Sequence, residues 1–276
     1  MEKMSVEQLK LKAAEIRVLS LEMIDNAGGG HIGGSLSAMD IMTALYFRVM
    51  NIDPKNPEKP DRDWFILSAG HKAAGYVPVL AARGFFDTQL LNSFNQLGSP
   101  FGMHPDMHKI VGCEASTGSL GHGLPIGVGV ALSLRMDGIP SKVFCLMGDG
   151  ETHEGTVWEA AMGAAHHKLD NLVAIVDYNK CSMDGPIDQV ISLEPIEDKW
   201  RSFGWRVIRI NGNEMTEVVE ALERACEPGS EGKPTVIIAD TLKGKGCEDI
   251  EGDYHWHYGV LGEERLGKTV SRLKGE

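Results

Sequence analysis

Two short apolar runs and the segment between them constrain the fold more than any other part of the sequence. The first run, residues 143–147, ends at Gly-Asp-Gly, residues 148–150. The second run, residues 172–176, ends at Asp-Tyr-Asn, residues 177–179, and a helix-like segment covers residues 154–168 in between. A unit of about 30 residues in this order is typical of two parallel strands joined by a crossover helix.

The same alternation of strands and helices continues along the chain. Further strands are expected at residues 64–67, 205–210 and 234–240, and helices at residues 6–25, 37–49, 194–203 and 214–226, with two more ending near residues 83 and 136. The last ~15 residues form either a docking helix or a frayed end. The pattern predicts an α/β fold, with residues 1–276 forming one three-layer, doubly wound domain around a mostly parallel sheet.

Polar residues follow both strands of the central unit. Ligands bind beyond the carboxyl ends of parallel strands, where Asp149 and Asn179 fall. Their oxygens are the ligands that Mg²⁺ prefers, and Gly148 and Gly150 let the backbone approach a phosphate closely. The pattern therefore indicates a magnesium–diphosphate site. The alternative is an ordinary turn in which Asp149 caps a helix; neither a dinucleotide fingerprint nor a P-loop is present.

Two histidines lie in segments that favour ligand contact. His31 is at the centre of a glycine-rich stretch, residues 26–35, which is expected to lack regular structure and to be either a site loop or a flexible linker. His71 follows the strand at residues 64–67 and precedes a helix, where it either meets a phosphate or caps the helix.

Composition and charge narrow the class of protein. The formal net charge of −12 argues against nucleic acid and anionic membranes as partners. The five cysteines include no CxxC pair, the charged N-terminus does not resemble a signal peptide, and no apolar run is long enough to span a membrane. A cytoplasmic protein is expected.

The motif GDGETHEG, residues 148–155, followed by Asn179-Lys180, resembles the thiamine diphosphate signature, and in its details it is similar to transketolases. The resemblance extends from about residue 13 to residue 257 through GHIGGSLS at 30–37, LSAGHKAAG at 67–75, GMHPD at 102–106, TGSLGHG at 117–123 and TLKGKG at 241–246. It implies the thiamine diphosphate-binding fold, with thiamine diphosphate and Mg²⁺ as cofactors.

The resemblance also implies roles for individual residues. It assigns substrate contact and proton transfer to His31, His71, His104 and His257. It places Glu154 and Glu159 in an acid network near a subunit interface; the alternative is that both are solvent-exposed charges on a helix. The cofactor contacts are His71, Gly118, Ser119, Leu120, Gly148, Asp149, Gly150, Asn179, Lys243 and His257. Metal ligands are Asp149, Asn179 and the Cys181 carbonyl. His122 departs from the family's glutamine, and the basic turn that contains Lys243 could alternatively be solvated surface.

Full-length transketolases carry two further domains, so the resemblance implies half of an enzyme. The expected partner is a separate C-terminal subunit with the pyrimidine-binding domain, in an α2β2 heterotetramer. The implied reaction transfers a two-carbon ketol unit from a ketose phosphate to an aldose acceptor. The alternatives are a subunit of another thiamine diphosphate enzyme, such as a 2-oxoacid dehydrogenase α subunit or a deoxyxylulose-phosphate synthase relative, and a non-catalytic subunit that keeps the fold.

Overall fold

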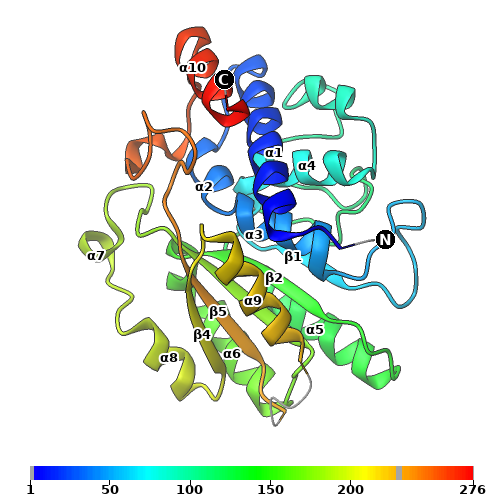
Figure 1. Cartoon of the computed structure of the whole chain (residues 1–276). Helices are drawn as coiled ribbons and strands as arrows, with labels where there is room; N and C mark the ends of the chain where they lie inside the picture. Colours follow the sequence, from blue (N-terminus) through cyan, green and yellow to red (C-terminus); the bar gives the residue numbers. More distant parts are fainter. Residues whose placement is uncertain (1–2, 228–231, 276) are drawn as a thin grey trace.

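Five parallel strands form the sheet of the computed structural model, which describes residues 3–227 and 232–275 (Figure 1). The strand order is β1-β2-β3-β5-β4, and all four neighbouring pairs are parallel. The strands are β1 (Trp64–Leu67), β2 (Val143–Gly148), β3 (Leu172–Tyr178), β4 (Arg206–Asn211) and β5 (Thr235–Asp240).

Helices cover both faces of this sheet. One layer contains α1 (Val6–Asn26), α3 (Met39–Ala44), α4 (Ala73–Arg83) and α9 (Met215–Cys226), and the other contains α5 (Gly123–Met136), α6 (Gly155–His166) and α8 (Ile196–Ser202). Helix α10 (Glu263–Lys274) packs on α1. The short elements are α2 (Ile32–Ser37), α7 (Ile187–Val190), the π-helical turn η1 (Leu45–Val49) and the 3₁₀ turns η2 (Gly70–Lys72), η3 (Thr88–Ser93), η4 (Gly150–His153) and η5 (Tyr254–His257).

Alternating side chains of the strands fill two separate cores. In β1, Phe65 and Leu67 belong to the core beneath α1 and α4, whereas Ile66 belongs to the core beneath α5 and α6. Strands β2 and β3 are buried along their whole length, which explains their continuous apolar runs. The prediction of a three-layer α/β fold is confirmed. Residues 1–2, 228–231 and 276 of the predicted single domain lie outside the described residues.

The glycine-rich stretch differs from its predicted form. Residues 26–35 were expected to lack regular structure, yet residues 32–37 form helix α2. Its glycines face close neighbours: a Cβ atom at Gly33 would lie 2.5 Å from the carbonyl oxygen of Trp256, and one at Gly34 would lie 3.0 Å from Lys72 Cε. The glycines thus allow a helix to pack tightly against two loops. The helix expected over residues 37–49 is divided between the end of α2, α3 and η1.

Other features agree more closely with the sequence. Helix α1 begins after Ser5, which forms a capping box with Gln8. Of the two forms expected for the C-terminal residues, the structure has a docked helix, α10. In the described part of the chain, no helix has both the length and the apolar character that crossing a bilayer requires.

Candidate active site

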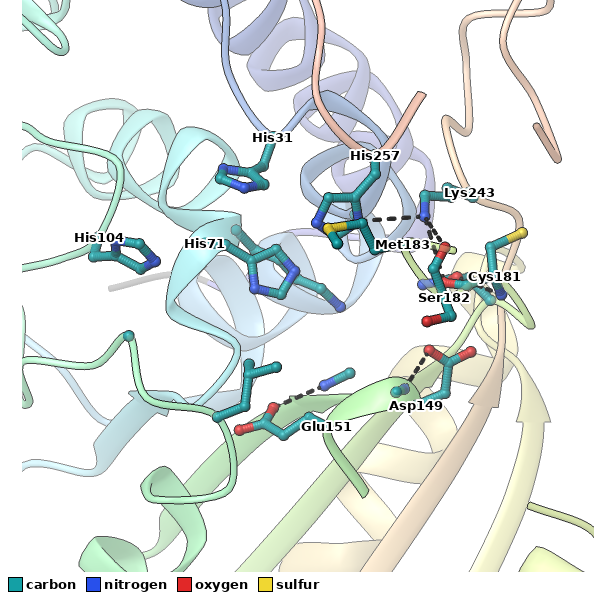
Figure 2. Close-up of a pocket in the computed structure, with 17 residues that line it drawn as sticks. His31, His71, His104, Asp149, Glu151, Cys181, Ser182, Met183, Lys243 and His257 are labelled. Carbon is teal, nitrogen blue, oxygen red and sulfur yellow. Dashed lines mark hydrogen bonds between the residues drawn. The ribbon is translucent and has the colours of Figure 1, made fainter. Parts of the chain in front are cut away.

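A cavity of about 370 Å³ opens beyond the carboxyl ends of β1, β2, β3 and β5 (Figure 2). Most of the residues selected from the sequence line it: His31, His71, His104, Gly118, Leu120, Gly148, Asp149, Gly150, Asn179, Cys181, Lys243 and His257. They come from segments that are up to 226 residues apart, so the parallel sheet is what brings them together.

Asp149 and Asn179 stand at the ends of β2 and β3. The Asp149 carboxylate is 3% exposed and accepts hydrogen bonds from the backbone amides of Gly150 at 2.8 Å and Lys180 at 2.6 Å. The second bond ties the loop after β2 to the loop after β3. The amide oxygen of Asn179 accepts a bond from the Cys181 amide at 3.1 Å. Both side chains therefore present oxygen atoms to one cavity from adjoining loops.

The charge of Asp149 has little local compensation. Burial and, to a lesser degree, the nearby Asp177 carboxylate raise its pKa to about 6, against the opposite effect of the Lys72 ammonium. Its two hydrogen-bond donors are uncharged backbone amides. A buried carboxylate in this state favours a cation as its neighbour.

Three histidines form a tight triangle on the other side of the cavity (Figure 2). The ring centroids of His31, His71 and His257 are each 5.2 Å from the other two, and His104 lies 6.4 Å from His31. His31 Nδ1 is buried without a hydrogen-bond partner. Because buried polar atoms are normally paired, this nitrogen has unused capacity for a ligand.

Burial keeps these imidazoles neutral. Burial, together with the neighbouring Lys72 and His257, lowers the pKa of His71 to about 2. Burial together with the Lys243 ammonium lowers the pKa of His257 to about 4. The pKa of His31 is also lowered by burial and by His104. At neutral pH each of these three rings can donate one hydrogen bond and accept another.

Lys243 places a buried cation beside the histidines. Its ammonium lies 3.5 Å from His257 Nδ1 and donates to the carbonyl oxygens of Cys181 at 3.4 Å and Ser182 at 3.3 Å. Burial lowers its pKa. The carbonyl that the family resemblance assigns to a metal is therefore already close to a cationic side chain.

The cavity has the shape and chemistry for a diphosphate and a hard cation. Cβ atoms at Gly148 and Gly150 would come no closer to other protein atoms than 3.7 Å and 3.9 Å, which is ordinary van der Waals contact, so the backbone at both glycines is not crowded by other side chains. Among the described residues, no group of three or more His, Cys, Asp and Glu side chains is arranged to hold a metal. The oxygen set of Asp149, Asn179 and a carbonyl is of the kind that binds Mg²⁺ together with phosphate oxygens.

Some predicted residues lie elsewhere. Glu154 and Glu159 are exposed rather than buried, and neither lines the cavity. The side chain of Glu154 instead lies against Gly121, where a Cβ atom would meet the Glu154 Cβ at 2.6 Å. Ser119 is exposed and outside the cavity lining. His122 is exposed, and its Nδ1 contacts the Leu120 carbonyl at 3.1 Å.

Several lining residues were not predicted from the sequence: Gly34, Lys72, Glu151, Ser182 and Met183. Glu151 joins three loops, because its carboxylate accepts hydrogen bonds from Ser68 Oγ and from the amides of Gly121 at 2.8 Å and Gly148 at 3.0 Å. Its place directly after Gly-Asp-Gly was the available signal. For Lys72, the available signal was its position next to His71.

Comparisons with known proteins agree with this geometry. The family model described as "Transketolase, thiamine diphosphate binding domain" matches residues 8–274. The chain is 44% identical over 99% of both chains to a 6-deoxy-6-sulfo-D-fructose transketolase subunit, SqwG, of Clostridium sp. (strain MSTE9). It is 40% identical to an apulose-4-phosphate transketolase subunit of Phocaeicola vulgatus, over 98% of this chain and 95% of that one.

A solved structure is similar over the same length. The transketolase of Campylobacter jejuni superposes with a TM-score of 0.92 at 34% identity, covering 98% of this chain and 43% of that one. The chain thus spans less than half the length of this structural relative and nearly the full length of the two subunit relatives.

Proposed function

The chain belongs to the transketolase family through its thiamine diphosphate-binding domain, and from this premise we propose that it is the N-terminal subunit of a two-subunit transketolase. The reaction is the transfer of a two-carbon ketol unit from a ketose phosphate to an aldose acceptor. The observation that carries the proposal is the single cavity that collects Asp149, Asn179, Lys243 and the histidine triangle at the carboxyl edge of the sheet.

The oxygen atoms at the ends of β2 and β3 would hold Mg²⁺. The ligands from this chain would be the Asp149 carboxylate, the Asn179 amide oxygen and the Cys181 carbonyl, and Gly148 and Gly150 would let the backbone approach the diphosphate. Thiamine diphosphate held by these residues would supply the nucleophilic carbon that the ketol transfer requires. The remaining contacts to the cofactor are Gly118, Ser119, Leu120, Lys243, His71 and His257.

The histidines orient the sugar and exchange protons with its hydroxyl groups. Neutral imidazoles suit this role, because one nitrogen accepts a proton while the other donates a hydrogen bond. The free Nδ1 of His31 is the clearest place for such a contact. His104 extends the set beyond the triangle, on the side of His31 away from His257 (Figure 2). Glu154 is assigned to the interface between subunits, which its exposure supports.

A separate C-terminal subunit completes the proposed enzyme. The relatives named as transketolase subunits align over 99% and 95% of their own length, whereas the one-chain transketolase is more than twice as long as the matched region. We assign the pyrimidine-binding domain to the partner and the assembly to α2β2. The proposed location is the cytoplasm, which the five free cysteines support.

The test is an assay of the chain together with its partner subunit, thiamine diphosphate and Mg²⁺. Donors include the ketoses in the relatives' names, 6-deoxy-6-sulfo-D-fructose and apulose 4-phosphate, and pyruvate tests for 2-oxoacid chemistry. We expect ketol transfer from a ketose and none from pyruvate. Turnover of pyruvate alone would reject the proposal, as would transfer that needs no thiamine diphosphate.

Replacement of Asp149 gives a second test. Asp149→Asn removes the only carboxylate of the proposed metal site, so Mg²⁺-dependent cofactor binding should fall at least ~10-fold by calorimetry. The matched control is Asp170→Asn. Asp170 is exposed and lies just before β3, at the amino-terminal end of the strand and opposite the cavity. Equal affinity in the two variants would contradict the metal assignment.

A further inference from the structure

A buried ion pair adjoins the cavity through its lysine and has no role in the proposed function so far. Lys72 and Asp177 are 2% and 0% exposed, and the ammonium nitrogen is 2.5 Å from Asp177 Oδ2. Lys72 also lines the cavity, where its ammonium is 3.7 Å from the position of a Cβ atom at Gly148. A buried ion pair has a large desolvation cost, so its presence calls for a reason beyond stability.

Asp177 accepts hydrogen bonds from side chains of four separate segments. Besides Lys72, it accepts hydrogen bonds from Ser37 Oγ at the end of α2, from Thr241 Oγ1 after β5 and from the Asn179 amide group at 3.2 Å. Three of these side-chain groups converge on Oδ2, and Thr241 Oγ1 pairs with Oδ1. The carboxylate is therefore fixed in position by separate segments of the chain.

The hydrogen bond between Asp177 and Asn179 determines the orientation of the Asn179 amide group. A carboxylate can only accept hydrogen bonds, so Asn179 must turn its NH₂ group toward Asp177. Its oxygen is then directed away, where it accepts the Cys181 amide at 3.1 Å and remains on the cavity side. The reversed amide would place oxygen against oxygen at Asp177 and an NH₂ group at the proposed metal site.

The positive charge of Lys72 compensates the negative charge of the buried Asp177 carboxylate. An ammonium group can only donate hydrogen bonds, so it matches an acceptor-only partner. The Lys72 ammonium and the Asn179 NH₂ group share one acceptor, the Oδ2 atom of Asp177. Without the cation, Asp177 would be an uncompensated charge with no solvent exposure. The cation and the carboxylate therefore act together on Asn179.

We propose that the Lys72–Asp177 pair is a positioning device for the divalent cation: it holds the Asn179 amide oxygen toward the cavity so that Mg²⁺ can bind. The inference rests on the proposed function. Asp177 contacts Asn179 and not the cavity itself, so the effect of the pair should appear in the affinity for Mg²⁺. Groups that orient metal ligands typically contribute about 10- to 100-fold to metal affinity.

The test replaces both charges with neutral groups of similar shape, Lys72→Met with Asp177→Asn. Neutralising the whole pair avoids an isolated buried charge, so this variant should fold with a melting temperature near that of the wild type. The measurement is the Mg²⁺ concentration that gives half-maximal thiamine diphosphate binding, monitored by calorimetry on the full chain with its partner subunit. We expect a rise of about 10- to 100-fold, with normal cofactor binding at saturating Mg²⁺.

The matched control is another ion pair of low exposure, Arg62–Glu114, neutralised as Arg62→Met with Glu114→Gln. Arg62 lies just before β1, at the opposite edge of the sheet, so the Mg²⁺ requirement of this control should equal that of the wild type. Lys72→Met with Asp177→Ala is the second variant. Alanine offers Asn179 no hydrogen-bond acceptor, and no buried charge is left without its partner, so the same rise is expected.

The outcomes separate this inference from the proposed function. An unchanged Mg²⁺ requirement in either folded Asp177 variant would overturn the positioning role while leaving the cofactor site intact. A wild-type complex that binds thiamine diphosphate without any dependence on Mg²⁺ would instead overturn the proposed metal site. A large rise in the Arg62–Glu114 control would also overturn the inference, because it would show a general response to lost charge.

Discussion

At the scale of single residues, the site is defined by groups whose pKa values are shifted away from their values in water. Asp149 is buried with a pKa of about 6, and His71 is partly buried with a pKa of about 2. Both shifts arise mainly from desolvation, which penalises the charged form of each group. The folded protein thus carries a cost at the site that a bound cation or anion can offset.

The His71 shift predicts acid instability. The folded pKa of about 2 lies below the unfolded value, so between these values the unfolded state binds more protons. Stability should therefore be highest above pH ~6.5 and fall as the pH decreases, by about 1.4 kcal/mol per pH unit for this one group. In His71→Gln, urea unfolding of the cofactor-free chain should lose that part of the slope.

A control separates this effect from general acid denaturation. His108 is exposed and lies outside the cavity lining, so His108→Gln should keep the wild-type slope. If the slopes of the two variants coincide, desolvation of a neutral His71 is not a source of the acid sensitivity.

At the scale of elements, helix α2 is the point where the loops of the site meet. A Cβ atom at Gly33 would lie 2.5 Å from the Trp256 carbonyl oxygen and 2.8 Å from Lys243 Cγ. The backbone amide of Gly244 also donates to the Gly33 carbonyl at 3.0 Å. Arg265 of α10 lies 5.5 Å from the Trp256 ring and supports the same loop from outside. Close packing at one glycine thus sets the positions of Lys243 and the loop around Trp256.

Two glycine-to-alanine changes test this role. Gly33→Ala should lower stability by about 1–3 kcal/mol through overpacking and weaken cofactor binding, because both loops must move. Gly267→Ala in α10 has no protein atom within 4 Å of the new Cβ and should instead raise stability by up to ~1 kcal/mol. Thermal unfolding and cofactor titration measure both effects. Similar melting temperatures for the two variants would contradict the proposed role of Gly33.

The spacing of apolar residues in the sequence predicted most of the helices and strands. β1 has the predicted bounds, because a short apolar run between a proline-rich loop and a glycine turn has few alternatives. Helix α2 was missed because glycine normally disfavours helices, and only the distant Trp256 and Lys243 make close backbone approach favourable there. The four-residue α7 is too short for periodicity to detect.

Some residues of the candidate site could likewise be predicted from the sequence, and others could not. Asp149 and Asn179 were found because they follow adjacent strands, whose ends must meet. Lys72 and Glu151 were missed because burial of a charged side chain depends on partners far along the chain, such as Asp177 and Ser68. Neither burial nor pairing over such separations leaves a mark in a local pattern.

At the scale of the whole molecule, the proposed enzyme needs a second subunit. The cavity opens at the edge of the sheet, and a TM-score of 0.92 relates the chain to 43% of a longer transketolase. We expect the chain alone to show only background ketol transfer and the mixture with its partner to recover activity. Full activity of the purified chain without a partner would contradict the proposed two-subunit enzyme.

The location of the metal is the most direct test of the proposed site. The measurement is an anomalous difference map from crystals of the two-subunit complex with thiamine diphosphate and Mn²⁺ in place of Mg²⁺, recorded at the manganese absorption edge. We expect one peak per cavity, coordinated by the Asp149 carboxylate, the Asn179 amide oxygen and the Cys181 carbonyl. A peak at the histidine triangle, or bound diphosphate with no metal between Asp149 and Asn179, would contradict the assignment.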